Sequence, residues 1–272
     1  MSITLPGEPF GDDLLPDLRL ERSPLVRTIV QVRYPASTEL LADSSKIFEV
    51  AKPLAAKYPT FEAGNELSFN LTPSGVTPAP NSAPRWVLRS LSGDDVVAVS
   101  PTSISLESKV YSNREGLLDL LQEILTAALP VVRPAYIERV GVRYTNHVDA
   151  PPLISSLSDL FRSELLQAQQ IPLGRARITQ TFTESVYDFG DQTGLTVRSG
   201  SLPAGATVDP SITPAQTESF VLDLDAYSQN RIMQPAVDDL LRSVSLLAEH
   251  AYRYFLWSLT PTGVSTFGGI EK

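Results

Sequence analysis

Two aspartates spaced two residues apart, Asp223 and Asp225, have the clearest chemical potential in this sequence. They lie in the segment SFVLDLDAY, residues 219–227, which reads as a β-strand. Successive side chains of a strand point to opposite faces, so both carboxylates share one face and the apolar residues between them take the other. Paired carboxylates can hold a divalent cation or serve as acid and base. No third acidic ligand is identifiable, so a metal-dependent hydrolase or nuclease using this pair is an alternative hypothesis only.

Arginines are predicted to lie on the same face as these aspartates. In Tyr136–Val148 (YIERVGVRYTNHV), Arg139 and Arg143 alternate with valines that point the other way. A similar strand at Val26–Tyr34 places Arg27, Gln31 and Arg33 on its corresponding polar face. We expect arginines and aspartates to meet as cross-strand pairs. Structural ion pairing, a ligand or partner groove, and a carboxylate metal site all remain open. The candidate binding residues of this face are Arg33, Arg139, Arg143, Asn146, His147, Asp223 and Asp225.

Neither histidine has the neighbours that catalysis would need. His147 follows Asn146 at a strand end and is interpreted as a surface or capping residue, and His250 as a packing residue of a long helix. The sequence has no cysteine and no Gly-x-Ser-x-Gly motif to supply a nucleophile. We therefore predict no catalytic residue, no metal site and no cofactor.

Four aromatic residues cluster near the end of the last predicted helix: Tyr252, Tyr254, Phe255 and Trp257. Four rings within six residues cannot all face the core, because a helix turns by about 100° per residue. Core packing explains some of these rings, and Tyr254 and Trp257 are the candidates to face a partner. Trp86, which opens a strand, is predicted to lie in the core.

The composition favours an ordinary globular protein over a disordered one. The chain has 272 residues, 42% of them hydrophobic, with a net charge of −9. This charge and the dispersed basic residues argue against a nucleic-acid partner. No signal pattern and no apolar run of about 20 residues is present, so we expect a cytoplasmic protein without membrane contact. Its expected partner is another protein or a second copy of itself.

The order of predicted elements is the same in the two halves of the chain: strand, helix, several antiparallel strands, long helix. Helices are expected at 44–58, 112–129, 155–167 and 234–256, the second capped by Ser112 and ended by Pro130 and the last with Pro235 in its first turn. Strands are expected at 25–35, 65–72, 85–91, 95–100, 103–110, 136–148, 177–187, 194–199 and 219–227. This order predicts an α+β fold in which two tandem repeats form a curved antiparallel sheet with helices on one face, TATA-binding-protein-like by analogy.

The predicted domain boundaries follow the proline-rich stretches. Residues 1–24 form an acidic, Pro/Gly-rich arm that packs on the body, binds a partner or is disordered. Residues 25–134 and 135–260 are the two repeats, and the Gly- and Ser-rich residues 261–272 are expected to be a flexible tail.

Three motifs and the last helix resemble a known family. The motifs are Ser23-Pro24-Leu25-Val26 before a strand ending Arg33-Tyr34, then Arg139–Asn146 (RVGVRYTN), then Leu222–Tyr227 (LDLDAY). With the last helix, which contains His250 and Phe255 and is followed by Ser258-Leu259-Thr260, they resemble a sporadically distributed, uncharacterised family of bacterial and phage proteins of similar length. The resemblance covers about Ser23 to Thr260. The acidic arm and the Pro/Ser-rich loops depart from the family pattern. Its patchy distribution implies a role in mobile elements or phage–host conflict.

These observations rank three functional hypotheses. The first is a non-enzymatic binding or interaction protein that uses the polar sheet face, the N-terminal arm or the C-terminal aromatics. The second is a subunit of a larger phage or bacterial assembly. The third is the hydrolase or nuclease with Asp223 and Asp225.

Overall fold

The computed structural model describes residues 4–65, 69–72, 75–78, 84–166, 168, 171, 174–209 and 212–271. Within these ranges, nine strands pair in one antiparallel sheet, so the chain is α+β with a large antiparallel sheet. From one edge to the other the order is β11 (Thr183–Asp188), β12 (Thr193–Leu202), β13 (Ser219–Ser228), β10 (Arg139–Val148), β2 (Leu25–Arg33), β8 (Ser103–Ser108), β7 (Asp95–Ser100), β6 (Pro84–Arg89) and β3 (Thr60–Asn65).

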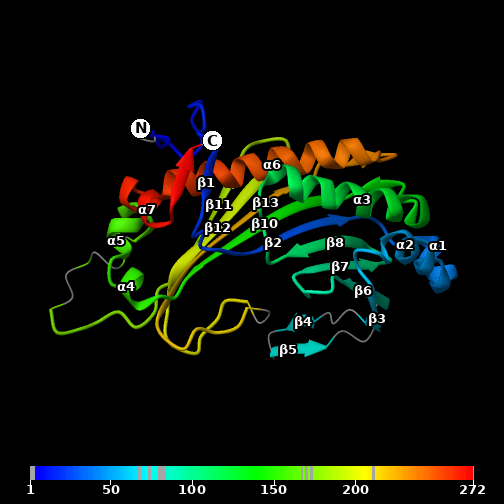
Figure 1. Cartoon of the computed structure of the whole chain (residues 1–272). Helices are drawn as coiled ribbons and strands as arrows, with labels where there is room; N and C mark the ends of the chain where they lie inside the picture. Colours follow the sequence, from blue (N-terminus) through cyan, green and yellow to red (C-terminus); the bar gives the residue numbers. More distant parts are fainter. Residues whose placement is uncertain are drawn as a thin grey trace.

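Two long helices, α3 (Arg114–Val132) and α6 (Val237–Ser258), cover one face of this sheet (Figure 1). On α6, residues spaced three or four apart are buried, including Leu240, Val244, Leu247 and Ala251. They pack on the apolar side of the central strands, where Val142 is fully buried. Each fully buried Val or Leu contributes about 2 kcal/mol through the hydrophobic effect, so this layer supplies most of the driving force for folding.

Shorter elements lie at the ends of the sheet (Figure 1). One end holds α1 (Thr38–Ala42), η1 (Ser44–Lys46) and α2 (Ile47–Leu54), and the other holds α4 (Pro151–Ile154), α5 (Leu157–Leu160), η2 (Ser163–Leu165) and α7 (Pro261–Thr266). A hairpin of β4 (Phe69–Thr72) and β5 (Gly75–Pro78) and the loop after β12 lie on the side opposite α3 and α6. The strand expected at 65–72 and the loop after it fall partly outside the described residues.

The N-terminal arm packs on the body and pairs with the C-terminal residues. Strand β1 (Leu18–Leu20) pairs with β15 (Gly269–Glu271). The prediction of a flexible tail at 261–272 is therefore wrong for the part that the structure describes, which forms α7 and β15. The physical reason is burial: Phe267 is only 2% exposed, and the Thr260 side chain caps α7 by accepting a hydrogen bond from the Gly263 N–H at 2.9 Å.

The ends of α3 differ from the predicted ones. Its N-cap is Asn113, whose Oδ1 accepts a hydrogen bond from the Gly116 N–H at 2.7 Å, rather than Ser112. Pro130 lies inside the helix instead of ending it. A proline near the C-terminus of a helix removes a single hydrogen bond, and burial of Val131 and Val132 in the next positions offsets that loss.

The prediction of one helix at 155–167 is wrong. The described residues of this range form only the short helix α5 and the 3₁₀ turn η2, and the short helix α4 ends before them at Ile154. Phe161 is extended instead of helical and pairs with Leu259, and its ring is 1% exposed. Tertiary packing of this ring therefore overrides the local helical pattern. Pro235 precedes α6, which begins at Val237.

Most strands agree more closely with the predicted ones, but the strand expected at 177–187 begins only at Thr183, and β3 was not predicted. The expected strand 136–148 is divided into β9 (Tyr136–Ile137), which pairs with β14 (Ile232–Met233), and β10. Gly93 lies in the turn between β6 and β7 and Gly190 in the turn between β11 and β12, and both glycines have positive φ angles, 75° and 79°. Trp86 is buried as predicted, at 5% exposure.

Candidate functional site

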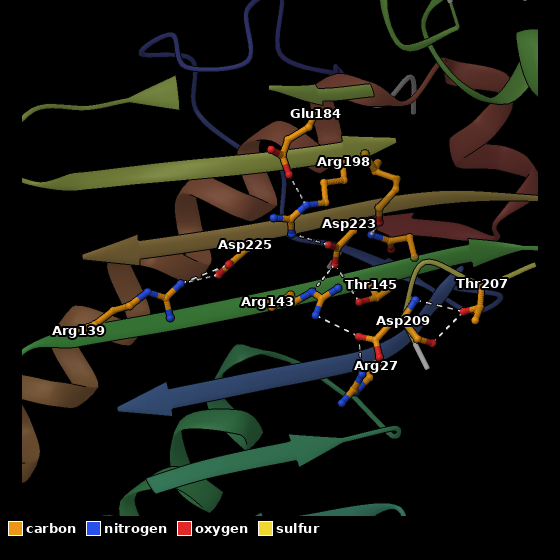
Figure 2. A network of polar contacts seen from close by, with 12 residues as sticks. Arg27, Arg139, Arg143, Thr145, Glu184, Arg198, Thr207, Asp209, Asp223 and Asp225 are labelled. Atoms are coloured by element: carbon orange, nitrogen blue, oxygen red, sulfur yellow. Dashed lines mark hydrogen bonds and ion pairs between the residues drawn. The ribbon is translucent and has the colours of Figure 1, made fainter. Parts of the chain in front are cut away.

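Strand register brings the predicted arginines and aspartates together on the face opposite the helices. In the β10–β13 pairing, Arg143 is opposite Asp225 and Thr145 is opposite Asp223. Residues opposite each other in an antiparallel pair share a face. On the other side of β13, Arg198 of β12 is opposite Asp223. Figure 2 shows these side chains converging from three neighbouring strands.

Asp223 is the centre of this group of side chains and is 0% exposed. Its Oδ1 accepts hydrogen bonds from Arg143 Nε at 2.7 Å and from Thr145 Oγ1 at 3.0 Å. Its Oδ2 lies 3.4 Å from Arg198 Nη1 (Figure 2). Sequence reasoning missed Thr145 and Arg198 as partners, although the alternation of their strands was the signal that places both on this face.

Asp225 forms a second, more exposed pair on the same strand. Its oxygens accept hydrogen bonds from Arg139 Nη2 at 3.1 and 3.2 Å. Burial raises the pKa of Asp225 above its usual value, and Arg139 opposes that rise. The Arg139 guanidinium also lies 5.4 Å from the centre of the Tyr227 ring. The expected cross-strand pairs are thus present.

A third carboxylate, Asp209, comes from the loop between β12 and β13. Its Oδ2 accepts from Arg27 Nη1 at 2.9 Å and from Arg143 Nη1 at 3.0 Å (Figure 2). Arg27 also donates to Glu107 on β8 at 2.9 Å. No sequence signal pointed to Asp209, because the loop reaches strands β2 and β10 only through the fold.

The charged side chains of this face are paired with one another in intramolecular ion pairs. Each oxygen of Asp223 and Asp225 faces an arginine, so the carboxylates are held as ion-pair partners and are not presented to a cation. Among the described residues, no group of three or more His, Asp or Glu side chains is placed to hold a metal ion. The geometry agrees best with the structural ion-pairing alternative for this face.

The other predicted residues of the face are dispersed. Arg33 is exposed and lies opposite Arg139. Asn146 is 3% exposed and its Nδ2 donates to the Leu222 carbonyl oxygen at 3.1 Å. The His147 backbone N–H donates to Pro24 O at 2.8 Å, and burial lowers the pKa of its side chain while Asp149 opposes this shift. These three residues do not join the Asp223 group.

Tyr254 does not face a partner, and that prediction is wrong. Its side chain is 3% exposed, because Phe10 of the arm covers it at 5.8 Å between ring centres. Phe10 also packs edge-to-face on Tyr187 and Phe189, both at 4.9 Å. Trp257, the other predicted residue, packs on Tyr254 at 5.2 Å and is half-buried.

Hydrogen bonds hold the rest of the arm against α6. Tyr252 Oη accepts from the Leu18 N–H at 3.0 Å and donates to the Pro16 carbonyl oxygen at 2.8 Å. Arg253 Nη1 donates to the carbonyl oxygens of Gly11 and Asp13 at 2.7 and 2.9 Å. The arm is therefore attached at several separate points, with room between it and the body.

That room is a cavity of about 1000 Å³ between the arm, the start of α3, α6 and strand β10. Its lining combines apolar groups such as Leu224 and Leu256 with the rings of Tyr111, Tyr144 and Tyr252. Small-molecule sites commonly have this volume and this mixture. A second pocket of about 290 Å³ on the opposite face, lined by Gln31, Arg85 and serines, is much smaller.

None of the described helices is both long enough and apolar enough to cross a lipid bilayer.

No protein-family model matches this sequence, and no curated protein matches it significantly.

Proposed function

We propose that this protein is a non-enzymatic binding protein and that its ligand occupies the cavity between the N-terminal arm and α6, called here the arm cavity. The observation that supports this proposal is the cavity itself, about 1000 Å³ in volume with apolar, aromatic and charged groups in its lining. Cavities of this kind bury most of the surface of a small ligand. The arm cavity is favoured over the polar sheet face, because arginines already neutralise the carboxylates there.

The experiment is ligand-observed NMR with benzyl alcohol, a small aromatic probe. We expect binding with a Kd of about 1 mM, since a ligand of this size gains only a few tenths of a kcal/mol per atom. Tyr111→Ala removes one aromatic wall of the arm cavity and should weaken binding several-fold. Tyr227→Ala removes the same side chain from the opposite sheet face and serves as the matched control. Binding that is absent, or that is insensitive to Tyr111→Ala, would contradict the proposal.

We also propose that the two halves are tandem repeats arranged as in the TATA-binding-protein type of fold. The strand order supports this: β2 and β10 are adjacent at the centre, and each is flanked by the last strand that its own half contributes to the nine-stranded sheet, β8 or β13. Membership of the bacterial and phage family remains a further proposal, supported by the three motifs. We further propose, as expected from the sequence, that the protein is cytoplasmic and that it has a protein partner.

A further inference from the structure

The charged residues of the arm cavity are predominantly acidic. The carboxylates of its lining are Asp12, Asp13, Asp17, Glu21, Glu115 and Glu249, against the cations Arg19, Lys109, Arg114 and Arg253. Of these cations, Arg253 already donates to two carbonyl oxygens of the arm. The protein as a whole has a net charge of −9, which also attracts cations. The electrostatic environment therefore disfavours an anionic ligand.

The walls of the cavity suit an organic cation in a second way. The rings of Tyr111 and Tyr144 pack edge-to-face with centres 5.6 Å apart, and Tyr252 and Phe255 also line the space. Faces of aromatic rings attract ammonium groups, because the ring quadrupole is negative above and below the ring plane. Several rings around one acidic space form the arrangement by which proteins recognise alkylammonium groups.

The hydroxyls of Tyr144 and Tyr111 add polar atoms to this lining. Tyr144 is 9% exposed and lines the cavity, and its hydroxyl lies within hydrogen-bonding reach of the Tyr111 hydroxyl. A phenol oxygen has two lone pairs, so it can accept a further hydrogen bond from an alkylammonium group, which has only donors.

Glu249 on α6 is the carboxylate best placed to neutralise such a ligand. Its ion pairs with Arg114 and Arg253 are long, 3.8 and 4.0 Å, and its side chain is 48% exposed. A carboxylate held only at these distances can approach an incoming cation without first losing a short hydrogen bond. Glu249 lines the same cavity as Tyr111 and Tyr144.

We infer that the arm cavity binds a small organic cation, an aromatic or alkyl ammonium compound, between the tyrosine rings and Glu249. This inference rests on the proposed function, because it names the ligand class of the same cavity.

The test compares three probes of nearly equal shape that differ in charge: benzylamine, benzyl alcohol and benzoate. Calorimetric or NMR titration at neutral pH should give a Kd for benzylamine about 3- to 10-fold lower than for benzyl alcohol, as expected for one cation–π contact and one partly exposed ion pair. Benzoate should bind most weakly. Tyr111→Ala should weaken all three, which separates binding in the cavity from general attraction to an acidic protein.

Glu249→Gln isolates the charge, because glutamine keeps the size of the side chain at an exposed helix position. It should remove most of the preference for benzylamine and leave binding of benzyl alcohol unchanged. If benzyl alcohol or benzoate binds as tightly as benzylamine, and Tyr111→Ala weakens that binding, the inference of a cationic ligand is wrong. The proposal that the arm cavity is a ligand site is then still supported. If no probe binds through Tyr111, the proposed function itself fails.

Discussion

At the scale of single residues, Asp223 holds the polar sheet face together. It is fully buried and accepts from Arg143, Thr145 and Arg198, which come from the strands on both sides. The pairs around it differ in exposure, since the Asp225 side chain is 24% exposed and the Asp223 side chain 0%. A buried carboxylate that neutralises two arginines should matter more than an exposed one.

The first prediction therefore compares these two aspartates. Asp223→Asn should lower the free energy of unfolding by about 3 kcal/mol, because Arg143 and Arg198 both lose their fully buried carboxylate partner and keep only Asp209 and Glu184. Asp225→Asn, on the same strand and face, should cost about 1 kcal/mol or less, because solvent screens its pair. Urea unfolding monitored by circular dichroism measures both. Equal losses for the two variants would show that burial does not set the strength of these pairs.

The second prediction concerns His250, whose ring stacks on Phe189 with ring centres 4.3 Å apart. Burial lowers the pKa of His250 below 6.5, with Glu249 opposing the shift and Arg253 adding to it. The unfolded chain then binds the proton more tightly than the folded protein. Stability contributed by neutral His250 is therefore full above pH 6.5 and is lost as the pH falls through the folded pKa.

His250→Phe should keep the stacking and reduce the loss of stability between neutral and mildly acidic pH. Thermal unfolding at several pH values measures this loss. Burial also lowers the pKa of His147, so His147→Gln should reduce the loss independently, and the double variant should show the smallest pH dependence. An unchanged slope in His250→Phe would contradict the assignment.

At the scale of elements, the third prediction concerns the N-cap of α3, which is Asn113 in the structure and Ser112 in the sequence-based prediction. Asn113→Ala removes the side-chain acceptor of the Gly116 N–H and should cost about 1 kcal/mol of stability. Ser112→Ala changes the residue that the sequence pattern indicated and should stay within about 0.5 kcal/mol of the wild type. Chemical denaturation of the two variants decides between the caps. A larger loss for Ser112→Ala would favour the predicted cap.

The elements also show where local pattern was insufficient. Residues 155–166 have helical spacing yet form short turns, because Phe161 is drawn into an extended pairing with Leu259. The sequence predicted that Tyr254 on α6 faces a partner, but in the structure Phe10 of the arm covers its ring. In both cases a residue distant in sequence supplied the deciding contact.

At the scale of the whole molecule, the two halves share one sheet and one core. Strands β2 and β10 pair at its centre, with Arg33 opposite Arg139 at one end of the ladder and Arg27 opposite Thr145 near the other. The buried core includes residues of both halves, and α3 packs beside α6. We therefore expect the halves to unfold together.

The chain contains two tryptophans, Trp86 on β6 and Trp257 on α6, one in each half. Trp257→Phe leaves a reporter in the first half, and Trp86→Phe leaves one in the second. For each variant, the fluorescence transition in urea should coincide with the transition seen by circular dichroism. Fluorescence transitions displaced from the circular dichroism curve, in opposite directions for the two variants, would indicate halves that unfold separately.

The sequence by itself determined the features that depend on local periodicity. Alternation in 139–145 and 219–227 was sufficient to predict which face Arg139, Arg143, Asp223 and Asp225 share, since a strand places every second side chain on one side. Spacing of three and four residues predicted α6. These patterns depend only on residues that are close to one another in the sequence.

Only the tertiary structure decided which of these groups are free to bind. Asp209 reaches Arg27 and Arg143 from a distant loop, and the arm covers Tyr254 and borders an open cavity beside α6. The C-terminal residues become a strand because β1 lies beside them. Contacts between distant segments depend on register and packing of the whole sheet, which no local period encodes. For that reason the polar face, prominent in the sequence, is internally paired, and the arm cavity appears only in the folded chain.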